Sequence, residues 1–353
     1  MGSTASAELN MGSQRGPIRL LPAGQDYLWG GNRLKEEFGK KINLTPLAET
    51  WECSTHPAGL SRLAEDPSRT LHDLLVEHPE FMGSHPAKSM PEAAAQGELP
   101  ILVKFIDALS DLSVQVHPDD DFAREYEDGQ LGKTEMWYVV DALPGTELVY
   151  GFSHDMTKES LQKEIENNTL ERSLQKVPVE KDDVFYIPAG TVHAIGAGSL
   201  IAEIQESSNL TYRLYDYHRV GKDGKERPLH VEKALQVARL RGGSLPKQPM
   251  RVLRYRPGYA SEFLCRCRYF EVKRLLINAS EKVGEESTNH VPFGTLFETD
   301  ETSFHVLICT DGDGVILCKG VRLSYAKGDC FFVPAGSQQI YIQGFATLLD
   351  VNC

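Results

Sequence analysis

The chain has 353 residues, of which 41% are hydrophobic and 25% are charged, and its formal net charge is −13. This composition is typical of a soluble globular protein, and the length favours two domains over a single core. A net negative charge repels nucleic acids and anionic membranes, which argues against both as partners. An anionic small-molecule substrate would therefore need a locally cationic pocket.

The sequence also lacks signals for a membrane or for export. No apolar run approaches the roughly 20 residues that span a bilayer, and residues 1–5 lack the charged-then-apolar order of a secretion signal. The seven cysteines include no pair of CxxC motifs, and only Cys265 and Cys267 lie close together. This pattern favours free thiols in a reducing compartment, so we expect a cytoplasmic protein. The sequence leaves the oligomeric state open.

Local patterns predict the elements in chain order. Residues 1–17 are expected to be an extension that does not pack. Apolar residues at three- to four-residue spacing predict helices, whereas short runs of branched and aromatic residues predict strands. Helices are expected at 70–81, 157–175 and 230–238, and strands at 101–106, 136–140, 200–204 and 304–309. The Pro-, Ala- and Ser-rich residues 84–99 are interpreted as a loop, and residues 241–249 as a linker.

One segment occurs twice, because residues 181–191 return at a constant offset as residues 327–337. Each copy predicts a turn, an apolar strand and a Pro-Ala-Gly turn, which indicates two similar β-domains. We expect a mainly β protein with a first domain at residues 18–240, on which helices are packed or inserted, and a second domain at residues 250–353. The second copy has Gln339 where the first has His193.

Four side chains predict a metal site in the first domain. Gln115 and His117 alternate along a predicted strand, so both point to one face at a spacing of about 6 to 7 Å. Glu135 follows, and His193 comes after the first Pro-Ala-Gly turn. Two imidazoles, one carboxylate and one amide oxygen suit zinc, and also manganese, cobalt, nickel or iron(II). A single anionic ligand leaves a divalent ion positively charged toward a substrate oxygen.

A structural interpretation of the same residues is the alternative. His117 would cap a turn before Pro118, Glu135 would pair with Lys133, and His193 would be a buried turn residue. Each residue alone fits this interpretation, but the spacing within two separate segments favours the metal site.

This spacing resembles the cupin pattern, in which one motif supplies two strand ligands and a later glutamate, and a Pro-x-Gly-x-x-His motif supplies the last histidine. The resemblance implies a small β-barrel around the ion, and the internal repeat then implies a bicupin. From about residue 18 to its end the chain also resembles the type I mannose-6-phosphate isomerases of the short bacterial form. The motifs that carry this resemblance are Leu28–Gly31, Glu49–Ser54, Val103–Ala108, Leu112–Pro118, Gly132–Tyr138 and Glu206–Asp216.

By this resemblance the chain interconverts mannose 6-phosphate and fructose 6-phosphate, with one zinc ion held by the four side chains named above. Arg213 matches an active-site arginine of the family. Moving a carbonyl between C1 and C2 builds negative charge on oxygen in an enediol-like intermediate, which a metal ion and a guanidinium stabilise. Longer family members carry an aromatic residue two positions after the last histidine; this chain has Ile195, so a role of that side chain does not transfer.

Four further residues are candidates for proton transfer and substrate binding. Glu203 resembles an acidic active-site position of longer family members, or it partners Arg213 or a lysine. Lys133 precedes the candidate carboxylate ligand by two residues and would face the same pocket, or it is solvated. Lys104 is a candidate for the substrate phosphate because an unpaired lysine inside a barrel is costly, with Arg213 and Lys133 as alternatives. Trp29 would form a pocket wall or only pack.

The leading hypothesis is a metal-dependent aldose–ketose isomerase. A sugar-binding or regulatory bicupin without chemistry is an alternative, which the complete ligand set and Arg213 argue against. An oxygen-activating iron cupin is a third, although such sites rely more heavily on histidine. We expect the second domain to be structural or interfacial, with Cys318 and Cys330 as buried apolar residues.

Overall fold

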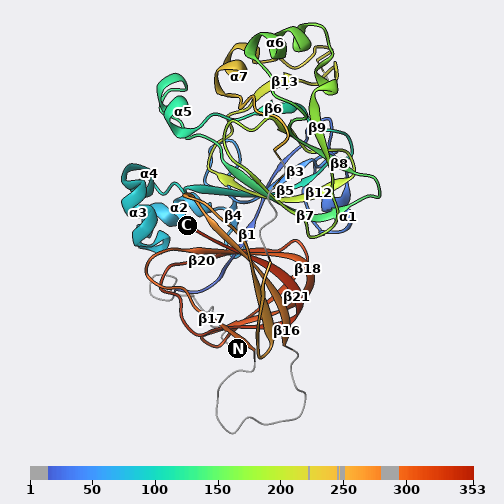
Figure 1. Ribbon diagram of the computed structural model, residues 1–353. Helices are drawn as coiled ribbons and strands as arrows, with labels where there is room; N and C mark the ends of the chain where they lie inside the picture. Colours follow the sequence, from blue (N-terminus) through green and yellow to red (C-terminus); the bar gives the residue numbers. More distant parts are fainter. Residues whose placement is uncertain (1–14, 222, 245, 247–250, 280–293) are drawn as a thin grey trace.

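The computed structural model describes residues 15–221, 223–244, 246, 251–279 and 294–353. Within these residues antiparallel strands dominate, which confirms the predicted mainly β fold. Figure 1 shows two halves, one above the other: the upper half holds two sheets and most of the helices, and the lower half is a long sheet built largely from C-terminal strands. None of the helices described is both long and apolar enough to cross a membrane.

The described strands form three sheets. The first, named the site sheet, has the order β10 (Val184–Ile187), β7 (Glu135–Ala142), β12 (Ser199–Glu206), β5 (Ile101–Asp107), β3 (Glu49–Cys53) and β2 (Ala23–Gln25). The second, named the facing sheet, has the order β13 (Tyr212–Tyr215), β6 (Val114–Val116), β11 (His193–Ala194), β8 (Glu147–Phe152) and β9 (Leu174–Pro178).

The third, named the C-terminal sheet, makes up most of the lower half. Its order is β14 (Leu253–Arg256), β15 (Tyr259–Arg266), β16 (Glu271–Ala279), β21 (Ile340–Asn352), β18 (His305–Cys318), β20 (Cys330–Val333), β1 (Ile18–Leu21) and β4 (Arg62–Leu63), with β17 (Thr295–Phe297) on β21 and β19 (Val321–Ala326) on β18. The pairing of Ile18 with Phe332 ties the start of the described chain to this sheet.

The site sheet is buried on both faces. Every residue of β5 is buried, and Ile101, Val103 and Phe105 belong to a core that also contains Val306 and Leu349 of the C-terminal sheet. Side chains of alternate residues point the other way, toward the facing sheet. A strand covered on both sides is apolar almost throughout, which explains the run at residues 101–106. The C-terminal sheet thus supports the site sheet from behind.

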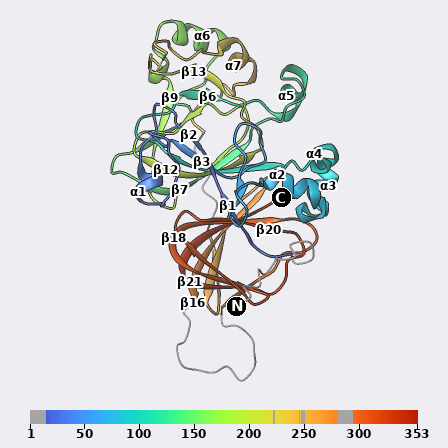
Figure 2. The ribbon, with the colours of Figure 1, turned by 180° about the vertical axis from the view of Figure 1, so that it is seen from behind.

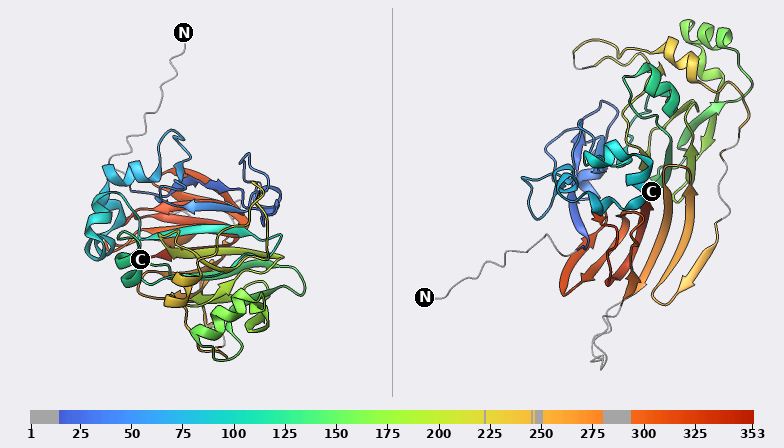
Figure 3. Two further views of the ribbon diagram at one scale, coloured as in Figure 1. Left: turned by 90° about the horizontal axis from the view of Figure 1, so that it is seen from above. Right: turned by 90° about the vertical axis from the view of Figure 1, so that its left-hand side faces the viewer.

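The helices lie around the upper half and at the junction of the halves. They are α1 (Arg33–Glu36), α2 (Leu71–Glu77), α3 (Ser84–Ser89), α4 (Pro91–Ala95), α5 (Asp120–Tyr126), α6 (Lys158–Glu166) and α7 (Val231–Val237), with the 3-10 turns η1 (Pro79–Met82) and η2 (Leu170–Arg172). Figure 2 shows α2 to α4 at the flank where the halves meet. In Figure 3 α6 and α7 lie at the end farthest from the C-terminal strands.

Two expectations about helices are corrected. Residues 84–99 are not a loop, because α3 and α4 lie there; Pro91 occupies the start of α4, where a missing N–H is not needed. The helix expected to reach residue 175 ends at Glu166, because Asn168 adopts the left-handed conformation (φ 56°) that ends helices. The helices expected at 70–81 and 230–238 are confirmed by α2 with η1 and by α7.

The internal repeat is confirmed in three dimensions. Its two copies form β10 and β20, each followed by a turn in which the glycine, Gly190 or Gly336, has a positive φ. A Cβ at Gly190 would approach the carbonyl oxygen of Val237 to 2.8 Å, so both backbone conformation and space require glycine. Residues 1–14 of the expected extension, and residues 245 and 247–249 of the expected linker, lie outside the described residues.

Candidate active site

The site sheet directs a row of side chains into the space between the two upper sheets. Trp51 pairs with Lys104, Lys104 with Glu203, and Glu203 with Trp137, across β3, β5, β12 and β7. Directly paired residues of antiparallel strands point to the same face. Lys104 and Glu203 therefore lie side by side on the inner face, and Glu135, two residues from Trp137, shares it.

The facing sheet supplies the second row. His193 on β11 pairs with Gln115 on β6, and Gln115 pairs with Arg213 on β13. His117 lies two residues after Gln115 and points the same way. Segments nearly 100 residues apart in sequence are thus joined by strand register, and the predicted site residues come together from both sheets.

Three of the predicted ligands form a buried cluster. Nε2 of His193 lies 3.2 Å from Oε1 of Glu135, and Nε2 of His117 lies 3.5 Å from Oε2 of the same carboxylate. One ligand atom from each of the three residues lies within 4.8 Å of the others, which is close enough for one ion. The side-chain amide of Gln115 adjoins the cluster, with its Nε2 3.4 Å from Nε2 of His193.

Backbone carbonyls orient both imidazoles. Nδ1 of His117 lies 2.7 Å from the carbonyl oxygen of Leu210, and Nδ1 of His193 lies 2.8 Å from that of Thr191. Because a carbonyl only accepts, each Nδ1 carries the proton and each Nε2 turns its lone pair to the cluster. Burial lowers the pKa of His193 to about 4 and that of His117 well below its usual range, so both rings are neutral, as metal ligands must be.

The surroundings of the Glu135 carboxylate favour a bound cation. Glu135 is fully buried, and apart from the ion pair of Oε2 with Lys133 neither oxygen has a hydrogen-bond partner among the described residues. Burial and the neighbouring Glu203 raise the pKa of Glu135, as expected for an anion short of positive charge. The nearest positive group is the ammonium of Lys133, 2.7 Å from Oε2 and 3.2 Å from Nε2 of His117. The two imidazoles and this carboxylate therefore suit a divalent metal ion. The ion pair of Glu135 with Lys133, which the structural interpretation of these residues anticipated, is present as well.

Lys104, the candidate for the substrate phosphate, already has partners within the protein. Its ammonium lies 3.3 Å from Glu203 and 3.6 Å from Glu49, and it stacks over the ring of Trp51 at 4.8 Å. Burial opposes the charged form, but Glu49 and Glu203 outweigh it and raise the pKa of Lys104. Lys104 is thus largely neutralised by two carboxylates.

The groups around Glu203 stabilise its ionised form. Trp137 donates its indole N–H to Oε2 of Glu203 at 2.9 Å, and the ammonium of Lys133 lies 3.8 Å from Oε1. Burial disfavours ionisation, but Lys133 and Lys104 outweigh it and lower the pKa of Glu203. Glu203 partners lysines, as one alternative anticipated, and not Arg213.

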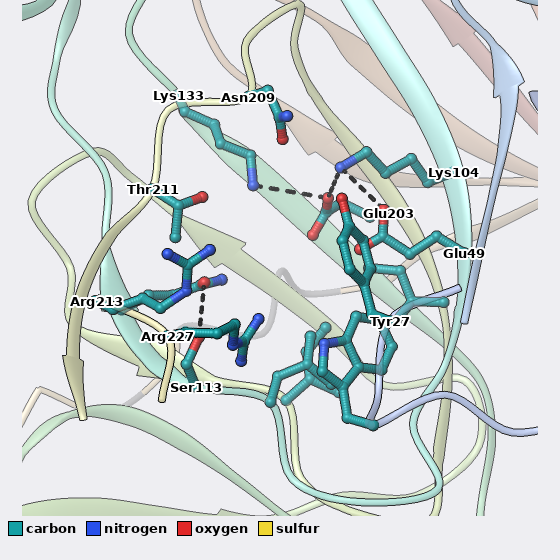
Figure 4. Close-up of a pocket in the computed structure, with 15 residues that line it drawn as sticks. Tyr27, Glu49, Lys104, Ser113, Lys133, Glu203, Asn209, Thr211, Arg213 and Arg227 are labelled. Atoms are coloured by element: carbon teal, nitrogen blue, oxygen red, sulfur yellow. Dashed lines mark hydrogen bonds and ion pairs between the residues drawn. The ribbon is translucent and has the colours of Figure 1, made fainter. Parts of the chain in front are cut away.

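One cavity lies beside the cluster and is lined by Gln115, Lys133, Lys104 and Glu203. Figure 4 shows Lys104, Glu203 and Glu49 on one wall and Arg213 on the opposite wall. Trp29 lines the cavity, as expected for a pocket wall, and stacks on Tyr27 with ring centroids 5.5 Å apart. The lining residues that the sequence did not single out as site residues are Tyr27, Glu49, Ile106, Leu112, Ser113, Ile195, Asn209, Thr211 and Arg227.

Some of these residues carried a sequence signal and others did not. Glu49 alternates with Trp51 on one strand, so the period of two places it on the inner face. Arg227 lies outside the described strands and helices, and no local pattern marks it. The predicted burial of Cys318 and Cys330 in the lower half is confirmed.

Two facing β-sheets with two buried imidazoles and a carboxylate between them define a cupin-type protein with a site for one metal ion. Comparison with known proteins agrees. The model of the phosphomannose isomerase type I catalytic domain matches residues 18–140, and that of the mannose-6-phosphate isomerase cupin domain matches residues 294–352. The second match bears out a cupin domain in the C-terminal part of the chain.

Individual relatives extend the match over nearly the whole chain. A mannose-6-phosphate isomerase of Streptococcus mutans is 42% identical over 63% of this chain and 67% of its own length, and one of Bacillus subtilis is 32% identical over 94% and 96%. The crystal structure of a Bacillus subtilis mannose 6-phosphate isomerase superimposes with a TM-score of 0.82 at 31% identity, covering 96% of this chain and 99% of that one. The chain belongs to the type I phosphomannose isomerase family and is an isomerase.

Proposed function

We propose that the cavity between the site sheet and the facing sheet interconverts mannose 6-phosphate and fructose 6-phosphate. The observation that carries this proposal is a cavity lined by a lysine–carboxylate pair and Arg213 that adjoins a buried His-Glu-His cluster, since Gln115 and Lys133 line the cavity and also contact the cluster. The relatives named mannose-6-phosphate isomerase supply the identity of the substrate.

We further propose that zinc is the bound metal, with His117, Glu135, His193 and Gln115 as its ligands. Nitrogen and oxygen donors of this kind suit zinc. The amide of Gln115 reaches the cluster, and rotation about its terminal bond exchanges Nε2 for Oε1, the atom that coordinates metals. When bound, the metal would act as a Lewis acid on substrate oxygen and stabilise the negative charge of an enediolate.

Glu203 is proposed as the base that removes the proton from carbon, with Lys133 as its partner. The carboxylate is ionised, and its Oε1 lies 3.8 Å from the ammonium of Lys133, so a proton has a short path between them. The indole N–H of Trp137 holds Oε2 and fixes the direction of Oε1. Isomerisation needs such a group to carry one proton between C1 and C2.

Three other residues complete the proposal. Arg213 faces the developing charge, and its buried Nε has no hydrogen-bond partner among the described residues, so the guanidinium keeps donors for substrate. Lys104 is assigned to positioning Glu203, since two carboxylates already balance its charge. Trp29 is proposed as an apolar wall against the sugar.

Residues 18–240 are proposed as the catalytic domain and residues 250–353 as a degenerate cupin domain, a division supported by the separate family models that match each part. The second part has Gln339 in place of the histidine and packs behind the site sheet. A cytoplasmic location is also proposed, in keeping with the seven free cysteines.

A coupled assay tests the function. Purified protein is supplied with mannose 6-phosphate, and fructose 6-phosphate formation is followed with and without a chelator, then after zinc is restored. We expect turnover that disappears with the chelator and returns with zinc. Binding of mannose 6-phosphate without turnover, and without exchange of the C2 proton with solvent, would instead favour the non-catalytic sugar-binding bicupin.

A further inference from the structure

The cationic side chains that line the cavity differ in how closely carboxylates surround them. Lys104 of the site sheet lies between Glu49 and Glu203, and Lys133, just before β7, lies against Glu135 and Glu203. These lysines have little unbalanced charge left for a phosphate dianion. The opposite wall carries two guanidiniums, Arg213 of the facing sheet and Arg227 of the segment that follows it, and no carboxylate among the residues that line the cavity there.

Arg227 is one of these guanidiniums, and it is held rigidly. Its Nε and Nη2 donate to the two carboxylate oxygens of Asp216 at 2.7 and 2.6 Å, a bidentate pair. Asp216 is 5% exposed and also accepts a hydrogen bond from Arg219. Since no hydrogen bond from Nη1 of Arg227 occurs among the described residues, this nitrogen keeps two donors while the carboxylate fixes its direction.

Arg213 and Arg227 carry like charges on the same wall. Burial, and next the charge of Arg227, lower the pKa of Arg213, which reflects two cations held close together. Anionic groups of the substrate would balance both charges, with the developing enediolate at Arg213 and the phosphate at Arg227. Ser113 and Thr211, which line the same part of the cavity, add hydroxyl donors of the kind that bind phosphate oxygens (Figure 4).

We infer that Arg227 binds the phosphate group of the substrate and sets the preference for a phosphorylated over a free hexose. This inference rests on the proposed function, which it extends to a residue outside the strand motifs. The row His193–Gln115–Arg213 spans two strand spacings of about 4.8 Å each, so a six-carbon chain with its reacting end at the cluster can reach the guanidinium wall.

The test compares R227Q with R219Q. Arg219 donates to the same carboxylate of Asp216 but does not line the cavity, so R219Q is a matched control for indirect effects through Asp216. We expect R227Q to raise the KM for mannose 6-phosphate roughly 10- to 100-fold, or about 1.4 to 2.7 kcal/mol, with a smaller change in kcat. The inhibition constant of inorganic phosphate should rise by a similar factor. R227K should lie between wild type and R227Q, and R219Q should stay within about threefold of wild type.

Two results would overturn the inference. One is a KM and a phosphate inhibition constant of R227Q close to those of wild type. The other is an equal rise of both constants in R219Q, which would mean that the two substitutions act through Asp216 and not through a contact of Arg227 with phosphate. Wild type is assayed first, so absence of turnover there would refute the proposed function alone. Calorimetric binding of inorganic phosphate to metal-loaded wild type and R227Q would then still test the role of Arg227.

Discussion

Replacing Glu206 with glutamine should make the free energy of unfolding less dependent on pH. Glu206 ends β12 and is 1% exposed, and its Oε2 accepts the backbone N–H of Thr134 at 2.6 Å. Burial and the neighbouring Asp120 carboxylate raise the pKa of Glu206 from 4.5 to about 8. Asp120 also accepts a hydrogen bond from Tyr269, so the two acids lie where the halves meet.

The sign follows from proton binding. Glu206 binds its proton more tightly in the folded than in the unfolded chain, so its contribution to stability is fully present below pH 4.5 and is lost as the pH rises through about 8. A pKa shift of one unit is worth about 1.4 kcal/mol, so the rise of the Glu206 pKa from 4.5 to about 8 corresponds to roughly 4 to 5 kcal/mol of unfolding free energy. Because the folded protein relaxes around a buried charge, we expect about 2 to 4 kcal/mol.

Glutamine has the shape of the protonated acid and does not ionise. Its carbonyl can still accept from Thr134, and its amide can donate toward Asp120. E206Q should therefore match wild type near pH 5 and exceed it by about 2 to 4 kcal/mol near pH 9.

Chemical denaturation at several pH values measures this difference. A chelator is present throughout, so that metal binding adds no pH dependence of its own. E232Q, at an exposed glutamate of α7, is the control and should show no pH-dependent gain. A gain of E206Q that is equal at pH 5 and pH 9, or one that E232Q shares, would refute the reasoning.

Two further predictions concern the metal site and the core. H193A removes one ligand of the cluster, so we expect metal affinity to fall by at least about 100-fold, measured as metal retained after dialysis; undiminished metal content would contradict the assignment of ligands. F105A opens a cavity between the site sheet and the C-terminal sheet and should cost about 3 to 5 kcal/mol in denaturant unfolding, whereas F345A, at a ring 63% exposed, should cost below about 0.5 kcal/mol. Equal losses in the two phenylalanine variants would mean that the halves do not share a core.

Period-two alternation made much of the candidate site predictable from sequence. Gln115 and His117 had to share a face, and the repeated Pro-Ala-Gly turn located His193 relative to a strand. These local rules place each group on a face, and the cupin-like spacing then brings the faces together. The strand predictions at residues 101–106 and 136–140 held for the same reason, since both lie in a sheet that is buried on each side.

Contacts that depend on register between distant strands could not be predicted. The partners of Lys104 come from β3 and β12, so its neutralisation follows from pairings that no local pattern encodes. Arg227 is placed by a carboxylate eleven residues earlier, in a segment without periodicity. The Pro-, Ala- and Ser-rich composition of residues 84–99 suggests a loop, although helices lie there, because proline is well tolerated in the first turn of a helix.

The burial of the site sheet on both faces gives its strands two separate sets of neighbours. Along β5, Ile101, Val103 and Phe105 must fit the C-terminal sheet, whereas Lys104 must fit the cavity. Amino-acid changes among relatives should therefore alternate along this strand, with one set of positions varying together with the C-terminal strands and the other with the substrate. The C-terminal part carries none of the proposed ligands, yet it constrains them through the thickness of a single sheet.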